Sequence, residues 1–261
     1  MFQKIFRYRQ FIISCIIREF QTRYQRSLMG AAWAVFNPLA MIVVYTVIFS
    51  QVMKAKLPDI DNTFGYSIFL CAGILSWGLF SEIVGRCIHV FLDNANTIKK
   101  LNFPRICLPL TIVGTAIVNF LIIFGIFLLF LIVSGNFPGI VILAVLPLLL
   151  TLIFFSIGLG VALGVLNVFF RDVGQLMGII LQFWFWATPV VYPASILPQW
   201  SLRFLAFNPM LQLVQGMQTI FVEQNWPDLM SIAAVAVLSM GLCLLAFRLY
   251  HNHVGEMVDE L

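Results

Sequence analysis

The order of apolar and polar stretches predicts helices that cross a membrane. Six apolar runs, separated by shorter polar stretches, occupy residues 31–53, 64–84, 106–133, 140–168, 173–191 and 229–250. A helix rises ~1.5 Å per residue, so about 20 apolar residues cross the hydrocarbon. The runs are continuous rather than alternating, and lipid forces backbone groups to pair within each segment. We therefore expect one all-α polytopic membrane domain over residues 1–261, with six transmembrane helices.

Residues 1–28 have the pattern of an amphipathic helix. One predicted face is apolar and comprises Phe6, Ile13, Ile17, Phe20 and Tyr24, whereas the other comprises Arg7, Ser14, Arg18, Gln21 and Gln25. A basic helix with an apolar stripe suits the membrane interface. The alternative is an ordinary helix that packs on another domain. The first apolar run follows directly and carries a helix-kinking Pro38.

The stretch 193–226 is apolar but interrupted. Arg203, the Asn208-Pro209 step and Glu223 fall within it. An arginine at a helix centre costs about 2.5–3.5 kcal/mol on insertion scales, and Asn-Pro breaks a helix. We therefore expect a re-entrant pair of short helices before the last span, on the periplasmic side. A seventh crossing at 202–222 is the alternative.

Composition and charge placement set the class and the orientation. The chain is 61% hydrophobic and 10% charged, whereas soluble proteins carry about 25% charged residues. With six spans, 12 of the 15 Lys and Arg residues lie on the side of both termini. The positive-inside rule then places both termini in the cytoplasm.

The residues that enzymes and ion-driven pumps need are missing from the pattern. There is no GxxxxGK[ST] phosphate loop, no catalytic set and no metal-ligand spacing among the five Cys and three His. Gly158-Leu-Gly160 lies in an apolar run and indicates helix packing. Few ionisable residues lie deep in the spans. Glu82 and Arg86 share a helical face, as an ion pair or as a gate. We expect no catalytic residue, metal or cofactor in this chain, and an external energy source.

Two polar stretches and two aromatic groups are candidates for function. The segments 86–105 and 169–172 are either docking sites for a soluble partner or solvated turns. Aromatic side chains gather in the first and fifth runs, as Trp33, Phe36, Tyr45 and Phe49 and as Phe183-Trp184-Phe185-Trp186. Such residues form interfacial belts or pack in cores, and their faces also stack on sugar rings.

Five ordered motifs resemble one family. They are RYQRSLMGAAWAVFNPL at 23–39, LNFPR at 101–105 followed by Leu108-Pro109-Leu110, NVFFRD at 167–172, TPVVYP at 188–193 with Leu197-Pro198, and FNPM at 207–210. Together they resemble the membrane subunit of type-2 ABC exporters, in the polysaccharide branch that exports O-antigen, capsule or teichoic-acid chains. Met29 replaces the leucine that many relatives have before glycine, which is a conservative change.

The resemblance implies partners and roles. Two copies of the chain would form a homodimer with two copies of a separate ATP-binding-cassette ATPase subunit, which binds ATP and Mg; membrane lipids surround the dimer, and no nucleic acid is involved. The first and fifth spans would line a conduit, with Trp33, Tyr45, Phe49, Phe183, Trp184, Phe185 and Trp186. Coupling to the ATPase would involve Asp93, Lys99, Lys100, Phe103, Arg105, Arg171 and Asp172.

The resemblance thus implies a permease of the bacterial inner membrane that moves a lipid-linked polysaccharide from cytoplasm to periplasm. From charge alone, the lipid diphosphate would enter at Arg18, Arg23 and Arg26; simple anchoring by positive charge is the other interpretation. The rivals are a type-2 exporter of a drug or small lipid, a membrane enzyme acting on lipid-linked sugars, and a membrane scaffold.

Overall fold

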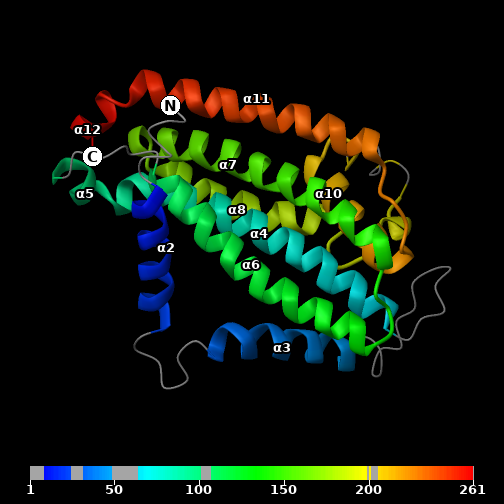
Figure 1. The fold of residues 1–261 in the computed structure, drawn as a ribbon. Coiled ribbons are helices and arrows are strands. Elements are labelled where there is room, and N and C mark those ends of the chain that lie inside the picture. Colours follow the sequence, from blue (N-terminus) through cyan, green and yellow to red (C-terminus); the bar gives the residue numbers. More distant parts are fainter. Residues whose placement is uncertain are drawn as a thin grey trace.

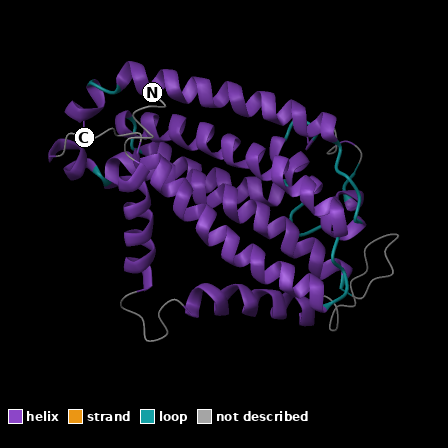
Figure 2. Ribbon diagram, in the orientation of Figure 1, coloured by secondary structure: helices purple, strands orange, loops and turns teal. Residues whose placement is uncertain are grey.

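The computed structural model describes residues 9–24, 32–48, 64–100, 107–198, 200 and 205–260. Helices account for most of these residues, and none of them lies in a β-strand (Figure 1 and Figure 2). In chain order the elements are α2 (Arg9–Tyr24), α3 (Trp33–Tyr45), α4 (Gly65–Asp93), α5 (Ala95–Lys100), α6 (Cys107–Val133), η3 (Gly139–Ala144), α7 (Val145–Phe169), α8 (Asp172–Ala187), η4 (Ala194–Ile196), α10 (Pro209–Gln218), η5 (Thr219–Glu223), α11 (Leu229–His253) and α12 (Glu256–Glu260).

Four described helices are long and apolar enough to cross a membrane. They are α4, α6, α7 with the preceding turn η3, and α11. The prediction of an all-helical chain with several helices of membrane-spanning length is confirmed. Helix α8 has 16 residues and α3 has 13, which is short of the ~20 residues that span the hydrocarbon. The count of six spans therefore stays a prediction.

Helix α4 is longer than its apolar run. The predicted second span ends at 84, but the helix continues through Arg86 to Asp93 and ends at Asn94. Its last turns still bury Cys87, Ile88 and Phe91, so packing maintains the helix past the first charged residue. The first part of the segment predicted as a polar connection, 86–105, is thus the end of α4, and α5 follows it.

Close helix contacts place α4 at the centre of the bundle. It contacts α3, α6, α7, α8 and α10, and it is the most buried of the four long helices. A Cβ on Gly164 of α7 would lie 2.5 Å from the Cys87 carbonyl oxygen, and one on Gly158 would lie 2.8 Å from the Cys243 amide nitrogen of α11. Both glycines therefore let backbones approach, which is how helices associate in lipid. The interpretation of Gly158-Leu-Gly160 as a packing feature is confirmed.

Helix α2 runs across the direction of the long helices, at the end of the bundle that also holds α5 and α12 (Figure 1). Its Ile16 packs on α6 at Gly114, where a Cβ would come within 2.2 Å of the Ile16 Cδ1. Two members of the predicted apolar stripe, Ile13 and Ile17, are exposed. Phe6 and the side chains of Phe20 and Tyr24 lie outside the described residues. The face that packs on the bundle is therefore next to the predicted stripe, and the two described members of the stripe point outward.

The Asn208-Pro209 step starts a helix rather than interrupting one. The Asn208 side chain accepts a hydrogen bond from the Met210 amide, and Pro209 occupies the first turn of α10, where no donor is needed. Helix α10 and the π-turn η5 are buried at the end of the bundle opposite α5 and α12 (Figure 1). They lie within the stretch predicted to be a re-entrant pair, and the pair itself stays a prediction. Residues 199 and 201–204 lie outside the described residues.

We expect Gly164→Ala to destabilise the protein. The added Cβ meets the α4 backbone, and overpacking typically costs about 1–3 kcal/mol. Gly241→Ala on α11 is the matched control, because its Cβ would meet nothing within 4 Å and alanine favours a helix by about 1 kcal/mol. Thermal unfolding in detergent measures both variants. Equal transition temperatures would contradict the proposed contact.

Candidate functional site

A cluster of polar side chains joins α2 to α4 and α6. The Arg86 guanidinium forms an ion pair with Glu19 of α2 and lies 3.5 Å from the Glu82 carboxylate one turn earlier. Arg86 also donates to the Thr115 hydroxyl of α6 at 3.3 Å. The Asn119 amide donates to Glu82 at 2.9 Å. One guanidinium thus balances two carboxylates from different helices.

The sequence predicted only part of this cluster. The ion pair between Glu82 and Arg86 is confirmed. The contributions of Glu19, Thr115 and Asn119 were missed, because they require α2 and α6 to pack beside α4. One signal was available in the sequence: Asn119 is a polar residue within a long apolar run, and buried amides in membranes need a partner.

A hollow of about 610 Å³ opens beside the cluster, between α2, α4 and α6. Arg18, Glu19, Arg86, His89 and Asp93 all line it. Arg18, one of the three predicted phosphate ligands, therefore lies near carboxylates as well as near a second arginine. The Arg23 side chain and all of Arg26 lie outside the described residues.

Of the four consecutive aromatic residues of α8, two pack into the core and two are exposed on the outer surface. Trp184 packs edge-on against Phe80 at 5.3 Å between ring centroids, and Phe185 packs against Trp77 at 5.6 Å. Phe183 and Trp186 are 71% and 59% exposed. Half of the predicted conduit set on α8 thus contributes to the core of the subunit, and the other half forms its outer surface.

Trp184 also faces a hollow at the α10 end of the bundle. Its indole N–H donates to the Asn208 side chain at 2.9 Å, and the Asn208 amide donates to the Thr188 hydroxyl at 2.9 Å. The hollow has a volume of about 460 Å³, and Tyr192 and Trp200 line it together with Trp184 and Asn208. Burial raises the pKa of the Tyr192 phenol above its ordinary value. Three aromatic rings and an amide therefore surround one open space.

The predicted aromatic residues of the first span are only partly described. Trp33 lies at the start of α3 and is exposed. The Tyr45 side chain and Phe49 lie outside the described residues. Helix α4 contacts both α3 and α8 and lies between them in Figure 1. The two helices with predicted conduit residues are thus on different sides of α4.

The predicted coupling residues gather at the end of the bundle near α2. Asp93 ends α4, Lys99 is exposed on α5, and Arg171 and Asp172 begin α8. Helix α5 contacts α4 and α12. The Lys100 side chain, Phe103 and Arg105 lie outside the described residues.

A buried asparagine fixes the geometry of this end. Asn167 donates to the Ile88 carbonyl at 3.0 Å and accepts from the Gly174 amide at 2.8 Å. It thereby links α7 to α4 and to the start of α8, beside Arg171 and Asp172. These two hydrogen bonds therefore attach the turn between α7 and α8 to α4 at Ile88.

Comparison with known proteins assigns the family. The profile of the ABC-2 type transporter family matches residues 10–222. The O-antigen export system permease protein RfbA of Myxococcus xanthus is 30% identical over 261 residues, covering 99% of this chain and 98% of that protein. An RfbA of Klebsiella pneumoniae is 28% identical over 207 residues, 79% of this chain and 78% of that protein. The polysialic acid transport protein KpsM of Escherichia coli is 23% identical over 255 residues, 94% of this chain and 93% of that protein. The profile match covers most of the chain, and this chain belongs to the ABC-2 type transporter family.

Proposed function

We propose that this chain is the permease of an ATP-driven exporter that moves a lipid-linked polysaccharide, of the O-antigen type, from cytoplasm to periplasm. The observation that carries the proposal is the similarity, over 99% of the chain, to a permease named for O-antigen export. The KpsM relative is named for transport of polysialic acid. The chain is then a transport subunit, and the chemistry of ATP hydrolysis belongs to a partner.

The proposed topology has six crossings. Residues 31–53 with α3, and 173–191 with α8, add two spans to the four long helices. An even number is supported by α2 and α12 lying at one end of the bundle (Figure 1). The buried arm of α10 and η5, which starts at an N-cap and ends at left-handed Gln224, supports a re-entrant region at the other end. The excess of Lys and Arg supports a location of the α2 end on the cytoplasmic side of the bacterial inner membrane.

The proposed assembly is a homodimer with two ATPase subunits. Helix α8 carries an outer apolar face of Leu176, Ile179, Ile180, Phe183 and Trp186, all exposed in the single chain. A second subunit against this face encloses a path between the two copies. The ATPases dock at the end that holds Asp93, Lys99, Arg171 and Asp172, and bind ATP and Mg themselves.

The proposed mechanism transmits motion through α4. When the ATPases close on ATP, they push on α5, and α5 is joined to α4 by the single turn at Asn94. The Glu19–Arg86–Glu82 cluster then carries the displacement to α2, and Asn167 carries it to α8. Arg18, Arg23 and Arg26 on the cytoplasmic side receive the lipid diphosphate in this scheme.

Two features favour a glycan over a drug or small lipid. The hollow at the α10 end combines Trp184, Tyr192 and Trp200 with the Asn208 amide, and aromatic faces with a nearby amide are suited to sugar rings. The end-to-end relatives also carry polysaccharide names. A membrane enzyme for lipid-linked sugars would need a carboxylate or histidine set at the interface. The charged groups of the described cluster are instead engaged with one another.

Deleting the gene tests the function directly. We expect finished, lipid-linked chains to accumulate inside the cell while surface polymer is lost, because synthesis continues without export. Cell fractionation with a polymer-specific antibody measures both pools, and re-expression of the wild-type chain is the control. Complete loss of polymer would indicate a role in synthesis. Unchanged surface polymer would favour a drug or lipid substrate.

We expect Trp200→Ala to slow export without lowering the amount of protein. Trp200 is 69% exposed and lines the aromatic hollow. An aromatic contact is worth about 0.5–1.5 kcal/mol, so the rate should fall roughly two- to tenfold. Trp226→Ala is the matched control, since Trp226 is 55% exposed and is not part of this hollow. Surface polymer appearing after induction measures the rate. A larger effect of the Trp226 change would refute a sugar contact at Trp200.

A charge exchange tests the coupling role of the polar cluster. Arg86→Glu places three carboxylates together, whereas Glu19→Arg combined with Arg86→Glu restores one cation and two carboxylates. Coupling between contacting charges is typically about 0.5–3 kcal/mol, so we expect the single change to lower export at least about twofold and the double change to recover much of it. Export and ATP turnover of the purified complex are the readouts. No recovery in the double variant would show that the pair does not couple the helices.

A further inference from the structure

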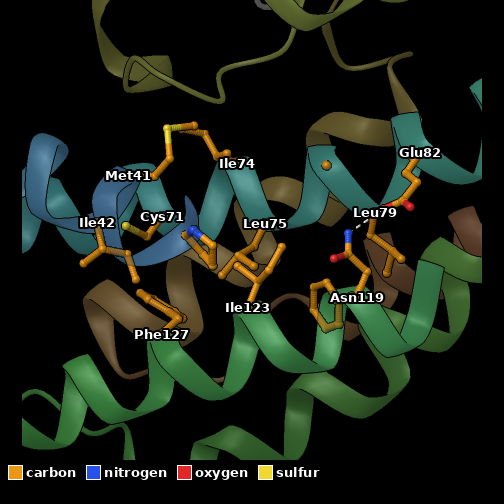
Figure 3. A pocket seen from close by; sticks show the side chains of 13 residues that line it. Met41, Ile42, Cys71, Ile74, Leu75, Leu79, Glu82, Asn119, Ile123 and Phe127 are labelled. Carbon is orange, nitrogen blue, oxygen red and sulfur yellow. Dashed lines mark hydrogen bonds between the residues drawn. The ribbon is translucent and has the colours of Figure 1, made fainter. Parts of the chain in front are cut away.

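An apolar hollow of about 220 Å³ lies between α3, α4 and α6. Figure 3 shows Met41 and Ile42 of α3, Leu75 of α4 and Phe127 of α6 around it. Its polar end is formed by Glu82 and Asn119, which are hydrogen-bonded to each other. The interior is thus hydrocarbon-like, with one charged group at one end.

The apolar hollow continues into the charged one. Glu82 also lines a third hollow, of about 360 Å³, with Glu19, Thr22 and Arg86. Those last three residues line the 610 Å³ hollow described above. The three spaces therefore follow one another along α4, from apolar to charged. An amphipathic lipid has the same sequence of parts, from an apolar acyl chain to a charged headgroup.

The length of the apolar hollow matches the hydrocarbon thickness of one leaflet. Along α4, the apolar hollow extends from Cys71 to Glu82, which is about 16 Å at ~1.5 Å per residue. Half of a ~30 Å hydrocarbon core is about 15 Å. An acyl chain beside Cys71–Glu82 therefore places its headgroup at the level of Glu82 and Arg86.

The charges discriminate between headgroups. Arg18 and Arg86 stand against Glu19, Glu82 and Asp93 around the charged spaces. A diphosphate would meet more carboxylates than guanidiniums. A headgroup with one phosphate and one primary ammonium can pair the phosphate with a guanidinium and the ammonium with a carboxylate. The ammonium can also donate hydrogen bonds to the carboxylates. A quaternary choline cannot donate them.

We propose that this cleft binds one phospholipid with a phosphoethanolamine headgroup, from the leaflet on the α2 side. The acyl chain fills the space between α3, α4 and α6, and the headgroup lies at the Glu19–Arg86–Glu82 cluster. The lipid then joins α2 and α3 to the bundle as a structural component. This site holds a membrane lipid and does not depend on which polymer is exported; of its residues, only Arg18 is shared with the proposed entry of the lipid diphosphate.

Native mass spectrometry of the full transporter tests the site. The complex is purified from vesicles of equal parts phosphatidylethanolamine, phosphatidylglycerol and phosphatidylcholine. We expect one phosphatidylethanolamine per permease subunit, enriched at least about tenfold over either other lipid, as charge-assisted hydrogen bonds of ~1.5–3 kcal/mol require. No enrichment, or retention of phosphatidylglycerol instead, would overturn the proposal. Retention of an added polyprenyl phosphate in place of phosphatidylethanolamine would assign the cleft to the substrate and overturn it too.

Two variants separate chain binding from headgroup binding. A Cβ on Gly78 meets nothing within 4 Å, and Gly78 lines the apolar hollow, so Gly78→Leu adds a side chain at the wall of the hollow with no clash at its Cβ. We expect it to lose the bound lipid, whereas Gly241→Leu, equally open and outside the hollow, keeps it. Glu82→Gln should retain lipid but lose the preference for ethanolamine over choline. Lipid retention by Gly78→Leu, or an unchanged preference in Glu82→Gln, would refute the site. Export by the intact complex is measured separately, so failure here leaves the transport function untouched.

Discussion

The close approach of α4 to its neighbours is the constraint on which the bundle depends. Lipid tails are as apolar as leucine, so burial of apolar surface does little to hold helices together in a membrane. Contact must come from tight packing, and Gly160 and Gly164 let the α7 backbone reach α4 at Val84 and Cys87. Gly158 does the same toward α11. The three helices α4, α7 and α11 thereby form the part of the subunit against which the others are arranged.

Polar groups then join the remaining helices to this framework. A charged side chain near the hydrocarbon is costly alone, and Arg86 is stabilised by Glu19 from α2 and Glu82 from its own helix. Asn167 uses both ends of its amide, one on α4 and one on α8. These contacts join elements that lipid-facing apolar surfaces would leave loosely associated. They also lie at the end of the bundle where we propose that the ATPase subunits dock.

The two ends of the molecule differ in chemistry. At the α2 end, arginines and carboxylates surround open spaces that continue into an apolar hollow. At the α10 end, aromatic rings and an asparagine surround another. We propose a lipid headgroup as the occupant of the first set and sugar rings as the occupants of the second.

The sequence alone determined the class of this protein, because long apolar runs in lipid have a single stable backbone solution, the helix. It also predicted the Glu82–Arg86 pair, since the spacing of four residues is a property of one helix. Only the tertiary structure decided that Glu19 completes that pair, because α2 and α4 meet through packing between distant segments. The tertiary structure also decided which aromatic residues of α8 are in the core. Four consecutive aromatic residues point around the whole helix, and Trp184 and Phe185 are the two that pack against Phe80 and Trp77 of α4. At Asn208-Pro209 the residues allow either a helix break or a helix start, and burial of α10 selected the start.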